Sequence, residues 1–390
     1  MVDFQLTPEQ EMVKKLARDF VEKRVKPNVV KWEEDGEIPD AVVREAGSLG
    51  LLGAPIPQEY GGAGLDALSY AVVTEEMGRG CSSLRTTFSV NTSLFGRTVL
   101  EFGSEAQKRK YLPAICSGER RGAWALTEHH SGSDAAGMRT TATPDGDEYV
   151  ITGRKMWISD GDRADHVVVF ARVGPPGHFD PKRKHQDLAS FVVDKGTPGF
   201  TTGSVMAKNK LGLRASHTAE LIFDQCRVPK ENMLGRVGDG WMQANRILQS
   251  GRLSVAAGAV GIAQAAMEAS LEYVQSREAF GRAIGKFQLV QEHVANMAKD
   301  VQAGRLLVWH AAWLKDQGHD NALATSLAKL FTAEMVMRVT ETAVQLHGGN
   351  GYSGEYPVER YFRDAKICGI YEGTNEIQKI IIGNKVLGYE

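Results

Sequence analysis

The chain has few cysteines and almost no net charge. Its four cysteines lie far apart among 390 residues, without a Cys-x-x-Cys pair, which indicates reduced thiols rather than a disulfide framework. Acidic and basic residues nearly balance, 48 against 46, so no basic excess indicates binding to nucleic acid. The N-terminal segment MVDFQLTPEQEM has no basic flank and no apolar run. We therefore expect no secretory signal and no membrane span, and a cytoplasmic protein, or one of the mitochondrial matrix if the chain is a processed mature form.

Several common catalytic signatures are also missing. The sequence contains no Walker A motif, no Gly-x-Ser-x-Gly and no His-Glu-x-x-His, which argues against the enzyme classes that use them. One match to the dinucleotide-binding pattern, Gly349 to Gly354, follows a helix-like segment rather than a strand, so it does not predict a Rossmann fold. His129 and His130 are adjacent, and neither has a Cys or carboxylate at metal-ligand spacing. We therefore predict no metal site.

The sequence does contain enough apolar residues for a folded protein, 42% against 24% charged residues, and its length suggests two or three packed units. Apolar residues recur at helical spacing over residues 1–120. Short runs rich in Val, Ile, Thr and Phe alternate with turn residues over 121–235, which predicts an antiparallel β-domain. Long helix-like stretches return over 236–390. The predicted fold class is therefore α+β, with a helical, a β and a second helical domain.

One glutamate stands out near the C-terminus. Glu372 lies in a Tyr-Glu-Gly-Thr sequence, within the stretch Gln345 to Gln378 that is dense in glycine, aromatic and charged residues. Its carboxylate could simply complement the dipole of a helix expected from Asn375 to Val386, with Thr374 as the N-cap. That interpretation explains an acidic residue, but not its glycine-flanked loop, so a functional carboxylate is the alternative.

This C-terminal stretch resembles the signature of the acyl-CoA dehydrogenase family, and four further motifs resemble that family in the same order along the chain. They are EYGGAGLD (Glu59 to Asp66), ALTEHHSGSD (Ala125 to Asp134), KMWISDG (Lys155 to Gly161) and REAFGRAIGKFQ (Arg277 to Gln288). The resemblance covers essentially the whole chain. It implies an N-terminal helical domain, a middle antiparallel β-domain and a C-terminal domain like a four-helix bundle.

The resemblance implies the FAD-dependent oxidation of an acyl-CoA thioester to the trans-2-enoyl-CoA. A base removes the α-proton while the β-hydride goes to flavin N5, and the position of Glu372 matches that of the family's catalytic carboxylate. Because a carboxylate is a weak base toward carbon, we expect the site to raise its pKa by burial. In the family, the amide of the base and a ribityl hydroxyl of the flavin hold the thioester oxygen, which stabilises the developing enolate.

The resemblance also assigns residues to the cofactor. Those expected to contact FAD from the β-domain are Trp124, Leu126, Thr127, Ser133, Trp157, Ile158 and Ser159. Those expected to reach the FAD of a neighbouring subunit are Arg277, Phe280, Phe287 and Gln288. The site would be completed by Gln345, Gly348, Gly349, Thr374 and Glu376. Arg277 could grip a pyrophosphate or simply be a solvated helix end. A cofactor that bridges two chains implies an oligomer, and since relatives are usually tetramers we expect a homotetramer.

On the substrate side, the acyl chain is expected between the helices of roughly Leu84 to Phe95 and the C-terminal bundle. The residues that the resemblance assigns to the acyl-CoA are Ser133, Gln249, Arg252 and Gly373. Arg85 lies in LRTTFSVNTSL, which is similar to the segment of glutaryl-CoA dehydrogenases where an arginine faces the distal substrate carboxylate. A dicarboxylyl-CoA substrate is therefore one hypothesis. Alternatively, Arg85 ends a helix or pairs with Glu75 or Glu76, because a buried arginine needs a partner.

Two departures from the family pattern concern the cofactor side. The loop from Thr127 to Asp134 has His129 where relatives have a proline, which affects its shape near the CoA arm. Ser159 and Asp160 stand where relatives often have Thr and Asn, so a hydroxyl is kept and a charge is added. Three functions stay open: a dehydrogenase that reduces an electron-transfer flavoprotein, an oxidase or other flavin-dependent relative, and a non-catalytic CoA-binding scaffold, against which Glu372 argues.

Overall fold

The N-terminal part of the chain folds into short helices. The computed structural model describes residues 5–175 and 180–389, and the helices of this part are α1 (Pro8–Phe20), α2 (Val29–Asp35), α3 (Asp40–Ser48), α4 (Ala67–Gly80), α5 (Ser82–Phe88), α6 (Arg97–Phe102) and α7 (Glu105–Ser117). The glycine-rich segment before α4 is an ordered loop with one 3-10 turn, Gln58–Tyr60. A π-helical segment, Ser89–Gly96, joins α5 to α6; such wide turns are frequent at functional sites.

The middle of the chain forms a β-domain around one sheet. Its strands are β1 (Gly122–Ala125), β2 (Thr141–Asp145), β3 (Glu148–Ser159), β4 (His166–Val173), β5 (Leu188–Asp194), β6 (Phe200–Met206), β7 (Thr218–Pro229) and β8 (Met233–Leu234). They follow the order β6-β7-β3-β2-β4-β5-β8, with β1 paired to β4. Most pairs are antiparallel as predicted, but β4 pairs in parallel with both β1 and β2. Alternation along a sequence reports burial and not strand direction, so these parallel pairs could not be predicted from it.

The C-terminal part consists of long helices around α8. Its elements are α8 (Gly240–Ser276), the hairpin β9 (Glu278–Ala279) and β10 (Arg282–Ala283), α9 (Gln288–Asp316), α10 (Ala322–His347), α11 (Val358–Ala365) and α12 (Asn375–Leu387). Alanine, valine and methionine side chains of α8, α9 and α10 form one apolar core, to which α4 adds its own face. By length and composition α8 could cross a membrane, but 78% of its apolar window is buried inside the protein, as in a core helix.

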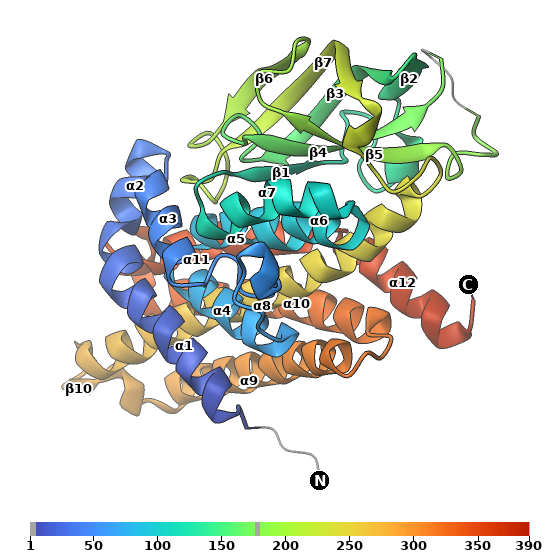
Figure 1. The fold of residues 1–390 in the computed structure, drawn as a ribbon. Coiled ribbons are helices and arrows are strands. Elements are labelled where there is room, and N and C mark those ends of the chain that lie inside the picture. The colour runs from blue at the N-terminus through green and yellow to red at the C-terminus, as the bar shows by residue number, and fades with distance from the viewer. Residues whose placement is uncertain (1–4, 176–179, 390) are drawn as a thin grey trace.

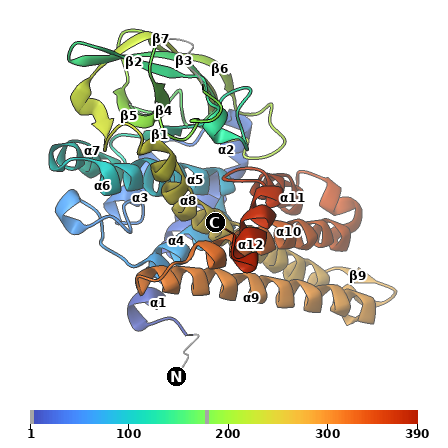
Figure 2. The same ribbon diagram turned by 90° about the vertical axis from the view of Figure 1, so that its right-hand side faces the viewer.

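The β-domain rests on the helices, as Figure 1 shows, with α5, α6 and α7 directly beneath β1 and β4. This sequence of helical, β and helical parts confirms the predicted fold class. Figure 2 shows α8, α9 and α10 extending side by side away from the β-domain, with β9 at their far end. The π-helical segment after α5 contacts both β1 and α8. The candidate site lies at this junction of the β-domain and the helices.

Candidate active site

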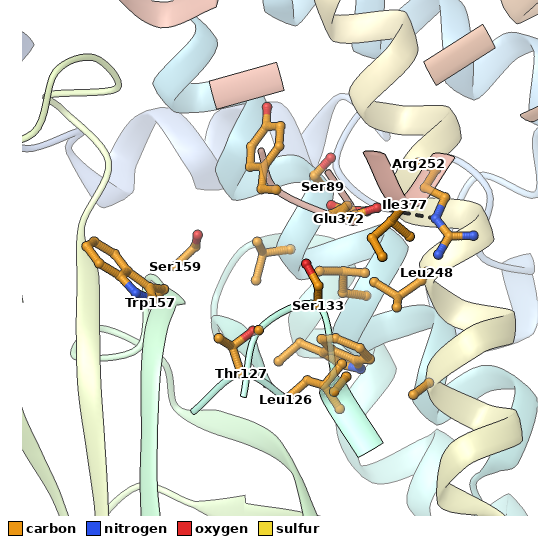
Figure 3. A pocket seen from close by; sticks show the side chains of 18 of the residues that line it. Ser89, Leu126, Thr127, Ser133, Trp157, Ser159, Leu248, Arg252, Glu372 and Ile377 are labelled. Carbon is orange, nitrogen blue, oxygen red and sulfur yellow. Dashed lines mark hydrogen bonds between the residues drawn. The ribbon is translucent and has the colours of Figure 1, made fainter. Parts of the chain in front are cut away.

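A cavity of about 370 Å³ opens where the β-domain meets the helices. Its β-domain walls come from β1, the loop after it and the end of β3, and its helical walls from α5, the π-helical segment, α8 and the start of α12. Figure 3 shows Trp157, Ser159 and Thr127 on one side, with Glu372 and Arg252 across from them. The cavity therefore brings the predicted base and part of the predicted cofactor set to one place.

Glu372 lies in a turn that two left-handed residues form just before α12. Its φ is 52° and that of Gly373 is 91°, and the left-handed conformation is costly for a residue with a side chain. The hydroxyl of Thr374 accepts a hydrogen bond from the N–H of Ile377 at 3.3 Å. Thr374 is thus the N-cap of α12, as its sequence context predicted. The cap leaves Glu372 outside the helix, with its side chain toward the cavity.

The backbone carbonyls of Glu372 and Gly373 are hydrogen-bonded to two different helices. Arg252 of α8 donates through Nε to the carbonyl of Glu372 at 3.2 Å, and Lys329 of α10 donates to the carbonyl of Gly373 at 2.7 Å. Gly251 of α8 faces the carboxylate so closely that a methyl group there would overlap Oε2. These contacts fix the position of the carboxylate.

The environment of Glu372 changes its acidity. Its Oε2 is buried and hydrogen-bonds no residue in the described part of the chain. Burial raises the pKa of Glu372 to about 7, against the opposing effects of the charges on Arg85, Arg252 and Lys329. The predicted rise in pKa is therefore present, and a carboxyl group that titrates near neutral pH is suited to proton transfer.

The β-domain side of the cavity offers an aromatic wall and hydroxyl groups. Trp157 adopts a φ of 63°, and its side chain is 56% exposed at the cavity edge. The hydroxyls of Thr127, Ser133 and Ser159 line the same cavity and bond no side chain or backbone group among residues 5–175 and 180–389. A flat apolar surface with unused hydroxyls fits a flavin ring and its polyol chain.

Arg85 lies at the helical end of the cavity and is buried. It lies in the middle of α5 and does not end the helix. Its guanidinium donates to Ser89 Oγ at 3.2 Å, to Thr86 Oγ1 at 3.1 Å and to the hydroxyl of Tyr371. Gly258 of α8 makes room for it, since a methyl group there would lie 2.7 Å from Arg85 Cδ. This end of the cavity is therefore polar and positively charged.

Glu75 and Glu76, the two carboxylates expected as alternative partners of Arg85, form ion pairs with other arginines. Glu75 pairs with Arg305 at 2.8 Å, and Glu76 pairs with Arg79 at 2.8 Å and with Arg18. The predicted alternative of an Arg85 pair with Glu75 or Glu76 is therefore wrong. Within the described residues, only hydroxyl groups accept hydrogen bonds from Arg85.

The structure divides the other predicted site residues into groups. Those lining the 370 Å³ cavity are Trp124, Leu126, Thr127, Ser133, Trp157, Ile158, Ser159, Arg85, Arg252, Glu372 and Gly373. Thr374 and Glu376 line a separate cavity of about 480 Å³ beside α10. Gln249 was predicted to touch the substrate but is not among the residues that line the 370 Å³ cavity.

The remaining predicted cofactor residues lie at the end of α8, α9 and α10 that carries β9 and is far from the β-domain (Figure 2), and none of them lines the cavity. They are Arg277, Phe280, Phe287, Gln288, Gln345, Gly348 and Gly349. The ends of α8 and α10 meet there through the stacked rings of Tyr273 and His347, 4.2 Å apart. Phe280 is 94% exposed and Tyr352 is 90% exposed. In one chain Arg277 is thus a solvated helix end, and this group does not meet the cavity-lining group.

One departure from the family pattern, Asp160, has structural partners. Asp160 is buried, and its Oδ2 accepts from Thr87 Oγ1 at 2.9 Å and lies 3.5 Å from Arg121. It therefore ties the end of β3 to α5. In the loop after β1, Glu128 pairs with the buried Lys155 at 2.8 Å. Lys155 also donates to the carbonyl of Leu126 at 3.1 Å, which holds this loop against β3.

Several lining residues were not predicted. Trp241, Ala244, Asn245 and Leu248 of α8 face Ile377 and Ile381 of α12 across the cavity. Their helical spacing is visible in the sequence, but such spacing reports a buried face and not what covers it. Lys329 was also missed, and so was the close approach of Gly251 to the carboxylate, because only the folded chain brings these residues to Glu372.

The comparisons with known proteins cover the whole chain. The family models described as the acyl-CoA dehydrogenase N-terminal, middle and C-terminal domains match residues 7–119, 123–226 and 238–387. An acyl-CoA dehydrogenase of Bacillus subtilis is 43% identical over 98% of this chain and 99% of its own length. Butyryl-CoA dehydrogenase from Megasphaera elsdenii is 40% identical with a TM-score of 0.94, over 99% of this chain and 100% of its own.

Two further solved structures are similarly close. The glutaryl-CoA dehydrogenase solved with glutaryl-CoA is 39% identical with a TM-score of 0.94, covering 100% of this chain and 98% of its own. A chain from work on the electron transferring flavoprotein of Acidaminococcus fermentans and flavin-based electron bifurcation is 42% identical with a TM-score of 0.95, over 99% and 100%. With three family domains in order over the chain, this protein belongs to the acyl-CoA dehydrogenases, a family of FAD-dependent oxidoreductases.

Proposed function

We propose that this enzyme converts an acyl-CoA thioester to the trans-2-enoyl-CoA, with Glu372 as the base that removes the α-proton. The observation that carries the proposal is the position of the carboxylate: it faces a cavity whose opposite wall is formed by Trp157, Thr127 and Ser159. A substrate carbon between them would have the base on one face and the cofactor on the other. FAD, when bound, supplies the acceptor for the β-hydride.

Residues around Glu372 support this role. Because its Oε2 has no hydrogen-bond partner within the described residues, no donor has to be displaced before the carboxylate takes a proton. With a pKa raised to about 7, it is a stronger base than an exposed glutamate and is still ionised in part at neutral pH. The backbone N–H of Glu372 bonds no other described residue. It is therefore available to a thioester oxygen, where it would stabilise the enolate charge.

For the substrate, we propose a short dicarboxylyl-CoA of the glutaryl type. Arg85 is a buried cation at the cavity end whose hydrogen bonds within the described chain go to hydroxyl groups and to no carboxylate, and its buried Nε has no hydrogen-bond partner there. Burying such a charge is costly without an anion, and a carboxylate at the end of the acyl group would provide one. A short monocarboxylic acyl group is the alternative, because the butyryl-CoA enzyme is as similar to this chain as the glutaryl-CoA enzyme.

We propose further that the ADP half of FAD is held by a second copy of the chain in a homotetramer. The two groups of predicted cofactor residues lie at different ends of the molecule, so one chain cannot offer both to one cofactor. The exposed Phe280 and Tyr352 are consistent with a surface that another chain covers.

The proposed electron acceptor is an electron-transfer flavoprotein rather than oxygen. Trp157 lines the cavity while more than half of its side chain stays exposed, so the wall expected beside the flavin reaches the surface where a protein partner could approach. An oxidase is the runner-up, and it would release peroxide without any protein acceptor.

The test is anaerobic bleaching of the flavin absorbance by a panel of straight, branched, cyclic and dicarboxylic acyl-CoA thioesters. Rapid bleaching by glutaryl-CoA, with slower bleaching by butyryl-CoA, is the expected result. Fast bleaching by butyryl-CoA alone would reject the dicarboxylate and keep the reaction. No bleaching by any thioester in an FAD-loaded sample would overturn the proposed reaction. Reoxidation with peroxide release in air would favour the oxidase.

A further inference from the structure

Lys329 of α10 is a buried cation whose role is not explained by the proposed reaction alone. Its side chain is fully buried and does not line the cavity. Its ammonium donates to the carbonyl of Gly373 at 2.7 Å, and within the described residues it forms no ion pair. Burial lowers the pKa of Lys329 to about 8. Because a buried charge without a counterion costs stability, a purely structural role is a poor explanation for a lysine here.

A second buried lysine, Lys155, differs from Lys329 in having a carboxylate partner. Lys155 is also fully buried, but it pairs with Glu128 at 2.8 Å. For Lys329, the carboxylates close enough to interact through charge are Glu372 and Glu376, and neither is bonded to it. The charge of Lys329 is thus held beside the turn that carries Glu372, without neutralising its carboxylate.

The hydrogen bond of Lys329 acts on the turn itself. Arg252 on α8 holds the carbonyl of Glu372, and Lys329 on α10 holds the next carbonyl, that of Gly373. These two peptide groups follow two left-handed residues, a conformation that needs support from its surroundings. Gln378 also donates to the Gly373 carbonyl, at 3.1 Å, so this oxygen would keep a partner if Lys329 were replaced.

We propose that Lys329 is a positioning residue for Glu372, which fixes the left-handed turn from α10 and stabilises the ionised carboxylate through its charge. This inference rests on the proposed role of Glu372 as the base. Three cations on three helices act on the carboxylate through their charge: Arg85 on α5, Arg252 on α8 and Lys329 on α10. Of the three, Lys329 alone does not line the cavity, so its removal changes the base and not the substrate contacts.

Three further titratable groups interact with Glu372 or Lys329: Tyr371, Cys368 and Glu376. Tyr371 lies next to Glu372 and Cys368 lies near Lys329, and burial raises the pKa of both, so both are uncharged at neutral pH. Glu376 at the start of α12 is exposed. Loss of the Lys329 charge therefore leaves Arg85 and Arg252 as the cations that stabilise ionised Glu372.

The experiment compares Lys329→Met and Lys329→Arg with the FAD-loaded wild type. For Lys329→Met we expect equal flavin content, a thermal midpoint no lower than wild type, and KM within about twofold, because the cavity is untouched. We expect kcat to fall by roughly ten- to a hundredfold through misplacement of the base. We expect the acid limb of kcat/KM to move up by roughly one pH unit, because the nearby positive charge is gone.

Lys329→Arg keeps the charge and should leave the acid limb in place. The control is Lys385→Met, which removes an exposed lysine of α12 that pairs with Asp320 and should change none of these quantities. If Lys329→Met is insoluble, Lys329→Gln gives the same readout, because it lacks the charge and keeps a donor. A Met or Gln variant with wild-type kcat and an unmoved acid limb of kcat/KM overturns the inference. A Met or Gln variant that loses stability while its acid limb stays in place overturns it as well.

Measuring Glu372→Gln in parallel separates the role of Lys329 from the role of Glu372, since near wild-type turnover in that variant refutes Glu372 as the base.

Discussion

Replacing Glu372 by glutamine should stabilise the protein at alkaline pH while removing its activity. The native carboxyl has a pKa of about 7, and the ordinary value is 4.5. Between these two values the folded chain holds a proton that the unfolded chain has released, so stability falls as the pH rises through this window. Above pH 7 the full cost is present. A glutamine has no such cost at any pH.

The change in the free energy of unfolding follows from the two pKa values of Glu372, about 7 in the folded chain and 4.5 ordinarily. The difference corresponds to about 3 kcal/mol of lost stability for the wild type at pH 8, and to about 1 kcal/mol at pH 5. These are upper values, because local relaxation and water entering the cavity reduce the cost of an ionised carboxylate. The advantage of Glu372→Gln over the wild type should therefore grow by about 2 kcal/mol between pH 5 and pH 8.

The assay is the midpoint of thermal unfolding of FAD-loaded wild type and variant at matched scan rates, every half pH unit from 5 to 8.5. Glu341→Gln, which removes an exposed carboxylate of α10, is the control for the substitution itself. We expect the difference in unfolding midpoint between Glu372→Gln and the wild type to grow with rising pH and to level off above about pH 7.5. A gap that is constant with pH, or a glutamine variant that is less stable at pH 8, would refute it.

Three further predictions follow from the same site. In the wild type, kcat/KM should rise about tenfold per pH unit below pH 7 and level off above it, measured by initial rates with a dye acceptor; a limb below pH 5 would contradict the buried environment of Glu372. Gly251→Ala should lower kcat by roughly a hundredfold with FAD retained, because the new methyl group overlaps the carboxylate of Glu372. The matched control is Gly383→Ala on α12, where nothing lies within 4 Å. Equal losses of kcat in both variants would reject the explanation. Measured above the acid limb, Arg85→Met should lower kcat/KM for glutaryl-CoA by about a hundredfold more than kcat/KM for butyryl-CoA. An equal loss with both substrates would assign Arg85 to the fold or to the acidity of Glu372.

The sequence predicted the parts of this protein that depend on local pattern. The change from helical to alternating spacing marked the β-domain, and Thr374 was recognisable as a cap because capping acts over three residues. Glu372 was identified by its motif. The surroundings that determine its acidity were not predictable, because Gly251 and Lys329 come from helices far away in the sequence. Arg85 is intermediate: its partners Thr86 and Ser89 are near neighbours in the sequence, but its bond to Tyr371 depends on how α5 packs beside that turn.

The most direct test of the account is single-turnover reduction of the flavin in Glu372→Gln, mixed anaerobically with the best acyl-CoA of the panel. We expect the variant to carry FAD and to bind the thioester with an affinity close to wild type. Its flavin should be reduced at least a thousandfold more slowly, because the α-proton has no acceptor. Flavin reduction at a rate near that of the wild type would show that Glu372 is not the base.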